Sequence, residues 1–184
     1  MKRIAIFASG KGSNAEKIIN ECKENVVLIV SNNPNAGVLE VARQNLIQTF
    51  VFDKNAFFCS EDLIPLLRNH RVEFIVLAGF LWMIPPFLLC EFPNKIINLH
   101  PSLLPKFGGK GMYGMNVHKA VIEAGETESG ITIHYVNENY DQGEIIFQEK
   151  CKIDFSETPE TLSQKIQKLE HLYFPQILKK LISE

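Results

Sequence analysis

The stretch Asn98–Pro105, NLHPSLLP, directly follows the apolar pair Ile96–Ile97 and predicts the end of a buried strand. Residues two apart in a strand share a face, so Asn98 and His100 are expected to point the same way. Pro101 disfavours the α region for His100 and cannot donate to a strand ladder. The pattern therefore predicts an amide and an imidazole side by side, where a strand ends and a stiff loop begins.

The chemistry of these two side chains suits acyl-type transfer. An imidazole can move a proton near neutral pH, and an amide N–H can donate to a developing oxyanion. In open α/β sheets, ligands bind at the carboxyl ends of strands. A second interpretation stands beside this one: the two side chains satisfy backbone groups at a strand end.

The N-terminal segment predicts an anion site. Ile4–Ala8 is a continuous apolar run, as in a central strand of a parallel sheet, and Ser9–Asn14 forms a glycine turn before a helix. Helix N-termini attract anions. The second strand, Val26–Val30, is followed by Ser31 rather than by an acidic residue, which argues against a dinucleotide. A phosphate monoester fits better; a tight turn with a Ser/Asn helix cap is the alternative.

The rest of the chain predicts an α/β fold. Further strands are expected at 48–52 and 74–78, and a β-hairpin at 130–136 and 144–147. Ser60 is a candidate cap for a helix that follows it. A C-terminal helix starts near Pro159, and Pro175 is expected to kink or break it.

Three further segments each allow two interpretations, one structural and one functional. Leu81–Ile84 is apolar where a loop should be polar, so it either walls a pocket or is covered core. The glycine-rich segment 108–114 is either flexible or folds over a substrate. Gln167 and Glu170 are neighbours on a helix surface, most simply as a solvated pair.

Composition narrows the function classes. The chain has 184 residues, of which 46% are hydrophobic and 22% charged, and a net charge of −2 without a basic stripe, which argues against nucleic acid as a partner. The four cysteines form no Cys-x-x-Cys pair, so no metal site is expected, and reduced thiols indicate a cytoplasmic protein. The apolar window 74–89 is too short for a membrane helix, and the N-terminus lacks a signal sequence.

Several separated motifs agree with one family. They are Gly10–Asn14, Leu77–Phe80, Asn98–Pro105, Tyr140–Gly143 and Gln167–His171. Their order and spacing resemble the phosphoribosylglycinamide formyltransferases, folate-dependent enzymes of purine synthesis within the wider formyl-folate superfamily. The likeness runs over nearly the whole chain.

The resemblance implies a Rossmann-like, mostly parallel sheet flanked by helices, with a C-terminal β-hairpin and helix completing the folate cleft. Residues 1–184 would form one domain, with 1–100 as the phosphoribosyl-substrate half and 101–184 contributing to the folate cleft. The enzyme would move the formyl group of 10-formyltetrahydrofolate, without a metal, to the amine of N1-(5-phospho-D-ribosyl)glycinamide. A cytoplasmic monomer or weak homodimer is expected, with small-molecule substrates and no membrane partner.

The resemblance also assigns roles. Asn98, His100 and Asp141 would be catalytic, with Asp141 favouring the imidazolium form of His100. The ribotide would be held by Gly12, Ser13, Asn14, Gln167 and Glu170. The folate would contact Leu81, Trp82, Met83, Ile84, Asn98, Asn137, Glu138, Asn139, Tyr140 and Asp141.

Two positions depart from the common family pattern. Lys54 or Asn55 stands near a place where members often carry a folate-binding arginine, and Asn116 replaces the first histidine of a His-x-His motif. A formyltetrahydrofolate deformylase is the main alternative, although such enzymes usually carry an N-terminal regulatory domain and this chain begins at its first strand. A non-catalytic nucleotide-binding module is the alternative from another class.

Overall fold

The computed structural model describes residues 1–59 and 62–183. Within them the strands form one seven-stranded sheet of order β3-β2-β1-β4-β5-β6-β7. The pairs from β3 to β5 are parallel, and β6 and β7 add an antiparallel hairpin. The mostly parallel α/β sheet with a C-terminal hairpin is confirmed. The strands are β1 (Ile4–Phe7), β2 (Val26–Ser31), β3 (Gln48–Val51), β4 (Phe74–Leu77), β5 (Ile96–His100), β6 (Glu128–Tyr135) and β7 (Ile145–Lys152).

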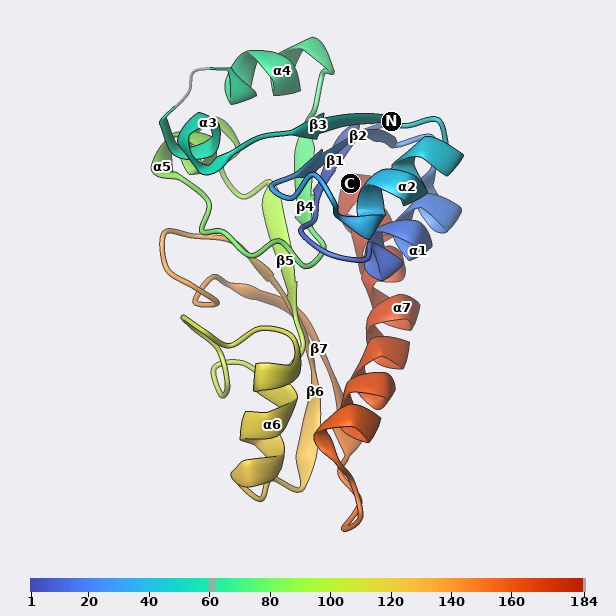
Figure 1. Cartoon of the computed structure of the whole chain (residues 1–184), viewed down its shortest axis with the longest axis vertical. Coiled ribbons are helices and arrows are strands. Elements are labelled where there is room, and N and C mark those ends of the chain that lie inside the picture. Colours follow the sequence, from blue (N-terminus) through green and yellow to red (C-terminus); the bar gives the residue numbers. More distant parts are fainter. Residues whose placement is uncertain (60–61, 184) are drawn as a thin grey trace.

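Helices cover both faces of the sheet (Figure 1). Alternate residues of β1 explain this arrangement: Ile4 and Ile6 pack with α1, α2, α6 and α7, whereas Ala5 and Phe7 pack with α3, α4 and α5. The helices are α1 (Ser13–Cys22), α2 (Gly37–Gln44), α3 (Lys54–Cys59), α4 (Leu63–Asn69), α5 (Pro86–Glu91), α6 (Met115–Glu123) and α7 (Pro159–Ser183).

The sheet topology places the site. The chain moves outward from β1 to β3, and then returns to lay β4 on the other side of β1. Crevices at the carboxyl ends of strands around such a reversal bind ligands. The glycine turn after β1, the apolar segment after β4 and His100 at the end of β5 all lie at this edge.

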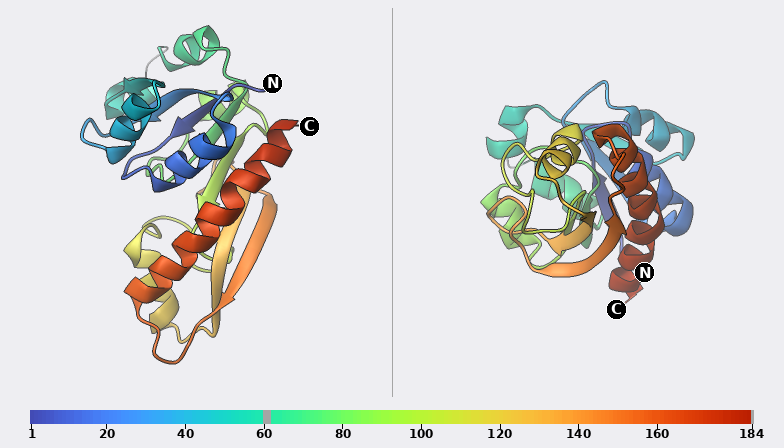
Figure 2. Two further views of the ribbon diagram at one scale, coloured as in Figure 1. Left: turned by 90° about the vertical axis from the view of Figure 1, so that its right-hand side faces the viewer. Right: turned by 90° about the horizontal axis from the view of Figure 1, so that it is seen from below.

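Two expectations about helices need correction. The C-terminal helix is not broken at Pro175: α7 continues through it to Ser183, with Phe174, Pro175 and Leu178 buried in the core. This packing compensates for the hydrogen bond that proline cannot make. Figures 1 and 2 show α7 running along the molecule to the neighbourhood of both termini, where Lys2 Nζ donates to the Leu181 carbonyl.

The short helix α3 is not evident in the sequence pattern. Asp53 Oδ1 accepts a hydrogen bond from the Ala56 N–H at its start, and Phe57 is fully buried within it. The expected cap Ser60 lies outside the described residues. No helix in the described part of the chain is long and apolar enough to cross a membrane.

The hairpin that completes the sheet depends on Gly130. A Cβ at this position would lie 2.0 Å from the Glu149 carbonyl oxygen of the neighbouring strand. We expect Gly130→Ala to lower the free energy of unfolding by at least about 2 kcal/mol, because the backbone of β7 would have to move. Gly125→Ala, which meets nothing within 4 Å but has a φ of +66°, should cost about 1 kcal/mol. Urea unfolding of both variants tests this; equal losses would contradict it.

Candidate active site

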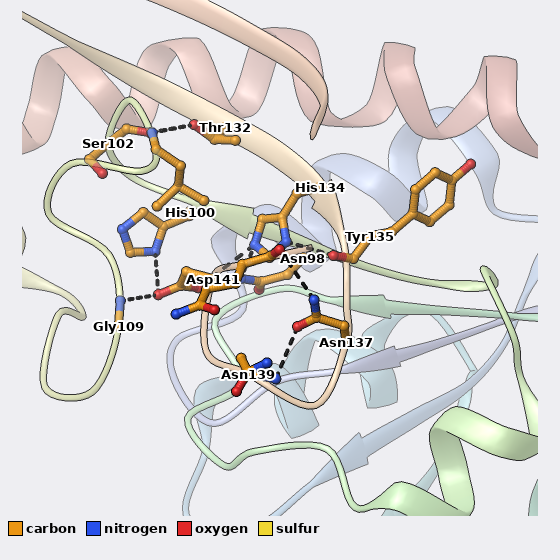
Figure 3. A network of polar contacts seen from close by, with 12 residues as sticks. Asn98, His100, Ser102, Gly109, Thr132, His134, Tyr135, Asn137, Asn139 and Asp141 are labelled. Atoms are coloured by element: carbon orange, nitrogen blue, oxygen red, sulfur yellow. Dashed lines mark hydrogen bonds and ion pairs between the residues drawn. The ribbon is translucent and has the colours of Figure 1, made fainter. Parts of the chain in front are cut away.

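Asn98, His100 and Asp141 converge on one point at the end of β5 (Figure 3). Asn98 Nδ2 donates to Asp141 Oδ1 at 3.4 Å, and His100 Nδ1 lies 3.5 Å from Asp141 Oδ2. Both β5 side chains share a strand face, as the two-residue spacing predicts. The three residues that the resemblance singles out as catalytic are therefore neighbours in space.

Asp141 reaches this point from the turn between β6 and β7, where it has a left-handed backbone with φ of 55°. The Gly109 N–H donates to its Oδ2 atom at 2.8 Å. Burial alone would raise the pKa of Asp141, but the nearby His134, the nearby His100 and the Gly109 N–H together lower it by more, so the net pKa is lowered. The carboxylate is thus ionised at neutral pH.

His100 lies between a backbone carbonyl and a carboxylate. Its Nε2 atom donates to the Phe107 carbonyl at 2.8 Å, while Nδ1 faces Asp141. Burial lowers the pKa of His100, and this outweighs the raising influence of Asp141 and of the Phe107 carbonyl. Asp141 favours the imidazolium form of His100, as expected. Burial has the larger effect, however, and favours the neutral ring in the ligand-free chain.

His134 is a member of this cluster that the sequence analysis did not single out. Its Nδ1 atom lies 2.7 Å from the Tyr135 carbonyl and therefore carries the proton, which leaves Nε2 to accept from Asn98 Nδ2 at 3.2 Å. This bond orients the Asn98 amide. The alternation of β6 places His134 on the face opposite Ile133, which was the available signal, but only strand pairing puts it beside Asn98.

The cluster opens into a cavity of about 530 Å³. Every predicted folate residue except Glu138, which is exposed, lines this cavity. Both interpretations of the apolar segment hold in part: Ile84 is buried in the core, whereas Leu81 and Met83 are exposed. Trp82 lines the cavity and packs against Phe52, Phe57, Phe58 and Phe80.

The cavity extends to the N-terminus of α1. Asn14, Gln167 and Glu170 line it, whereas Gly12 and Ser13 lie next to it without lining it. Helix α1 begins at Ser13 after Gly12 with φ of 84°, and no side chain caps it, so the Ser/Asn cap interpretation is wrong. A Cβ at Gly12 would lie 2.7 Å from the Val38 backbone, so this tight approach requires glycine.

Gln167 is exposed, as expected of a solvated side chain, but both it and Glu170 bond residues at the start of α1. Asn14 Nδ2 donates to Glu170 Oε2 at 2.8 Å, and Gln167 Nε2 donates to Ser13 Oγ at 3.4 Å. Burial raises the pKa of Glu170, although the Asn14 bond opposes this. The Asn14 Oδ1 atom is buried without a hydrogen-bond partner among the described residues. Helix α7 therefore brings polar groups to the anion site at α1.

The glycine-rich segment contacts the cluster directly. Gly109 and Gly111 have φ of 96° and 90°, and Gly109 bonds Asp141 as described. Asn116, which replaces a common family histidine, donates from Nδ2 to the Gly111 carbonyl at 3.1 Å. Within the described residues, no group of His, Cys, Asp or Glu side chains is arranged to hold a metal; the expectation of a metal-free enzyme stays a prediction.

The buried histidines predict a pH dependence of stability. Burial lowers the pKa of His118 and of His100 below the ordinary value of 6.5. The unfolded chain then binds more protons at these two histidines than the folded chain as pH falls through this value, so their contribution lowers the free energy of unfolding from about pH 7 to about pH 5, whereas the raised pKa of Glu170 acts in the opposite direction. The pKa of Asp141 is lowered from 3.8, so that group titrates below this window.

Urea unfolding of His118→Leu across this range is the measurement. The variant should show a shallower decrease than the unchanged chain, because one buried titrating group is removed. Parallel curves for the two proteins would contradict the assignment of a lowered His118 pKa.

Comparisons with known proteins agree on one family. The Formyl transferase family matches residues 2–178. A relative from Arabidopsis thaliana named "Phosphoribosylglycinamide formyltransferase, chloroplastic" is 43% identical over 187 residues, which cover 96% of this chain. A Bacillus subtilis relative named "Phosphoribosylglycinamide formyltransferase" is 41% identical over 191 residues, covering 99% of this chain and 95% of its own length. The chain spans 64% of the length of the Arabidopsis protein.

A solved structure agrees with these sequences. The crystal structure of phosphoribosylglycinamide formyltransferase from Bacillus halodurans superposes with a TM-score of 0.90 at 38% identity, covering 100% of this chain and 96% of the other. With a family match over almost the full length and this agreement in fold, the chain belongs to the formyl transferase family.

Proposed function

We propose that the chain transfers the formyl group of 10-formyltetrahydrofolate to the amine of N1-(5-phospho-D-ribosyl)glycinamide, a step of de novo purine synthesis. The observation that carries this proposal is the convergence of Asn98, His100 and Asp141 within one cavity. One end of that cavity has an apolar wall, and the other reaches a helix N-terminus. Relatives named for this activity support it.

The two ends of the cavity suit the two substrates. Leu81–Ile84 and Tyr140 offer an apolar wall for the flat pterin and benzoyl rings of the folate. Gly12–Asn14 at the start of α1 would hold the ribotide phosphate on backbone N–H groups and the helix dipole. Glu170 would orient the amino end of the ribotide, together with Gln167.

The cluster between these ends suits formyl transfer. As the ribotide amine attacks the formyl carbon, negative charge develops on the formyl oxygen. The Asn98 amide would donate to this oxygen, and so would His100 once it is protonated. The developing charge beside Asp141 raises the proton affinity of an imidazole that burial otherwise keeps neutral. The amine loses one proton as its bond to the formyl carbon forms, and His100 would take up this proton and pass it to the folate nitrogen as the bond between that nitrogen and the formyl carbon breaks.

The other assignments follow from the same proposal. Residues 1–100 would form the ribotide-binding half and 101–184 would complete the folate cleft, although Gln167 and Glu170 on α7 reach the ribotide end. Formyl folate would serve as co-substrate without a metal. A cytoplasmic location, and a monomer or weak homodimer without nucleic-acid or membrane partners, stay predictions.

Substitutions in the cluster test the chemistry. We expect His100→Ala and Asp141→Asn each to lower kcat by about 100- to 1,000-fold, as loss of an oxyanion-stabilising group does. The measurement is the rate of tetrahydrofolate release, followed by the change in absorbance with and without the ribotide. Lys119→Gln, an exposed change outside the cavity, is the control.

The same assay separates the alternatives. Release that requires the ribotide supports transfer, whereas equal release without it indicates a deformylase in which water replaces the amine. If a well-folded chain releases no tetrahydrofolate, either with or without the ribotide, it would be a non-catalytic module. A folded His100→Ala variant with full turnover would overturn the catalytic assignment.

A second pair of substitutions tests the two ends of the cavity. Trp82→Ala should raise KM for the folate by about 10-fold or more, which corresponds to ~1.4 kcal/mol of binding, and leave KM for the ribotide nearly unchanged. Glu170→Gln should do the reverse. Steady-state kinetics with each substrate varied in turn measures both values; a Trp82→Ala variant impaired mainly toward the ribotide would refute the division.

A further inference from the structure

A hydrogen-bonded network links β7, at the edge of the sheet, to the turn that follows His100. Thr132 Oγ1 donates to the Ser102 carbonyl at 2.7 Å and accepts from the Leu104 N–H at 3.0 Å. Gln148 Nε2, on β7, donates to Thr132 Oγ1 at 2.9 Å and to the Leu104 carbonyl at 3.0 Å. Gln148 thus donates one hydrogen bond to the turn itself and one to Thr132 of β6, which in turn bonds Ser102 and Leu104.

The turn 102–107 also carries the Phe107 carbonyl, which is the hydrogen-bond partner of the His100 imidazole. The Ser102 hydroxyl donates to the Lys106 carbonyl at 2.8 Å. The next residue, Phe107, has a left-handed backbone with φ of 56°, and its carbonyl accepts from His100 Nε2 at 2.8 Å. Figure 3 shows Ser102 and Thr132 close to His100. Contacts therefore run without a gap from Gln148 to His100.

We propose that Gln148 is a positioning residue for the formyl transfer, because its amide clamps the turn 102–107 whose last carbonyl holds the His100 ring. This inference rests on the proposed function. Gln148 does not line the cavity, so it cannot touch either substrate. Its influence must pass through Thr132 and Leu104 to the carbonyl of Phe107.

The clamp depends on donors rather than on packing alone. Ser102 and Thr132 are fully buried, so their polar atoms have no water to replace a lost partner. Without the Gln148 amide, the Leu104 carbonyl loses the one hydrogen bond that ties it to β7. The turn would then be free to shift, and a shift of about 1 Å near a reacting group can cost up to about 100-fold in rate.

The titration of His100 reports on the clamp. His100 faces Asp141, His134 and His118, and the Phe107 carbonyl raises its pKa against the lowering effect of burial. A turn that moves away weakens this bond. The pKa of His100 should therefore fall further in a variant without the clamp, while the other three groups stay in place.

The experiment compares variants that keep or lose the donors. Gln148→Leu removes both donors at similar volume, and Thr132→Val removes the hydroxyl while Thr132→Ser keeps it. Gln176→Leu makes the same chemical change at an exposed position of α7 outside the cavity. NMR titration of the His100 ring in each ligand-free variant measures its pKa, and the dispersion of the same spectra shows that each variant is folded.

We expect a lowered His100 pKa in Gln148→Leu and Thr132→Val, and the unchanged value in Thr132→Ser and Gln176→Leu. Wherever ribotide-dependent release is observed, kcat should fall about 10- to 100-fold in the first two variants with little change in either KM. An unchanged His100 titration in folded Gln148→Leu, or in folded Thr132→Val if the former does not fold, would overturn the inference. If the chain without substitutions is inactive but the variants show the expected His100 titrations, the proposed function is refuted and the clamp by Gln148 stays supported.

Discussion

The buried carboxylate of Asp141 is the group on which the arrangement of the site depends. It lies 43 residues from Asn98, and yet the two side chains are in hydrogen-bond contact. A buried carboxylate is costly unless donors surround it. Asn98 and Gly109 donate hydrogen bonds to it, His100 and His134 lie close by, and the pKa of Asp141 is lowered as a result. The β6–β7 turn, the glycine-rich segment and β5 must keep their places for these contacts to form.

This requirement couples segments with different local behaviour. β5 is a buried strand with little freedom, whereas the segment 108–114 carries several glycines in left-handed conformations. The Gly109 N–H is the point at which the glycine-rich segment meets the cluster at the end of β5 through Asp141. A shift of that segment would change the hydrogen bonding of the carboxylate and, through it, the charge of the imidazole. Strand β5 holds Asn98 and His100, and the glycine-rich segment completes their surroundings.

The sheet explains why polar chemistry and an apolar wall meet in one cavity. β1, β4 and β5 lie side by side, and each ends at the same edge. Gly12 follows the first, Leu81–Ile84 follows the second, and His100 ends the third. Helix α7 then adds Glu170 from the far end of the chain, where it accepts from Asn14. A pocket built in this way brings the start of α1, an apolar wall and a titratable cluster into one cavity.

Much of this could be read from the sequence where short-range rules apply. The strand before Asn98, the shared face of Asn98 and His100, the glycine turn before α1 and the hairpin with Ile131 and Ile133 facing inward all follow from two-residue alternation and turn chemistry. The interruption expected at Pro175 was wrong, because burial of α7 against the sheet outweighs a local helix-breaking preference. Helix α3 escaped the pattern because its short length leaves too few periods to recognise.

The sequence by itself therefore determined the order of the strands, the fold class and the identity of the side chains at the carboxyl edge, since these depend on neighbours along the chain. Only the tertiary structure decided that His134 orients Asn98, that burial outweighs Asp141 in setting the charge of His100, and that Gln148 reaches the turn after β5. Those facts depend on strand register and on exclusion of water, which arise when segments distant in sequence pack together.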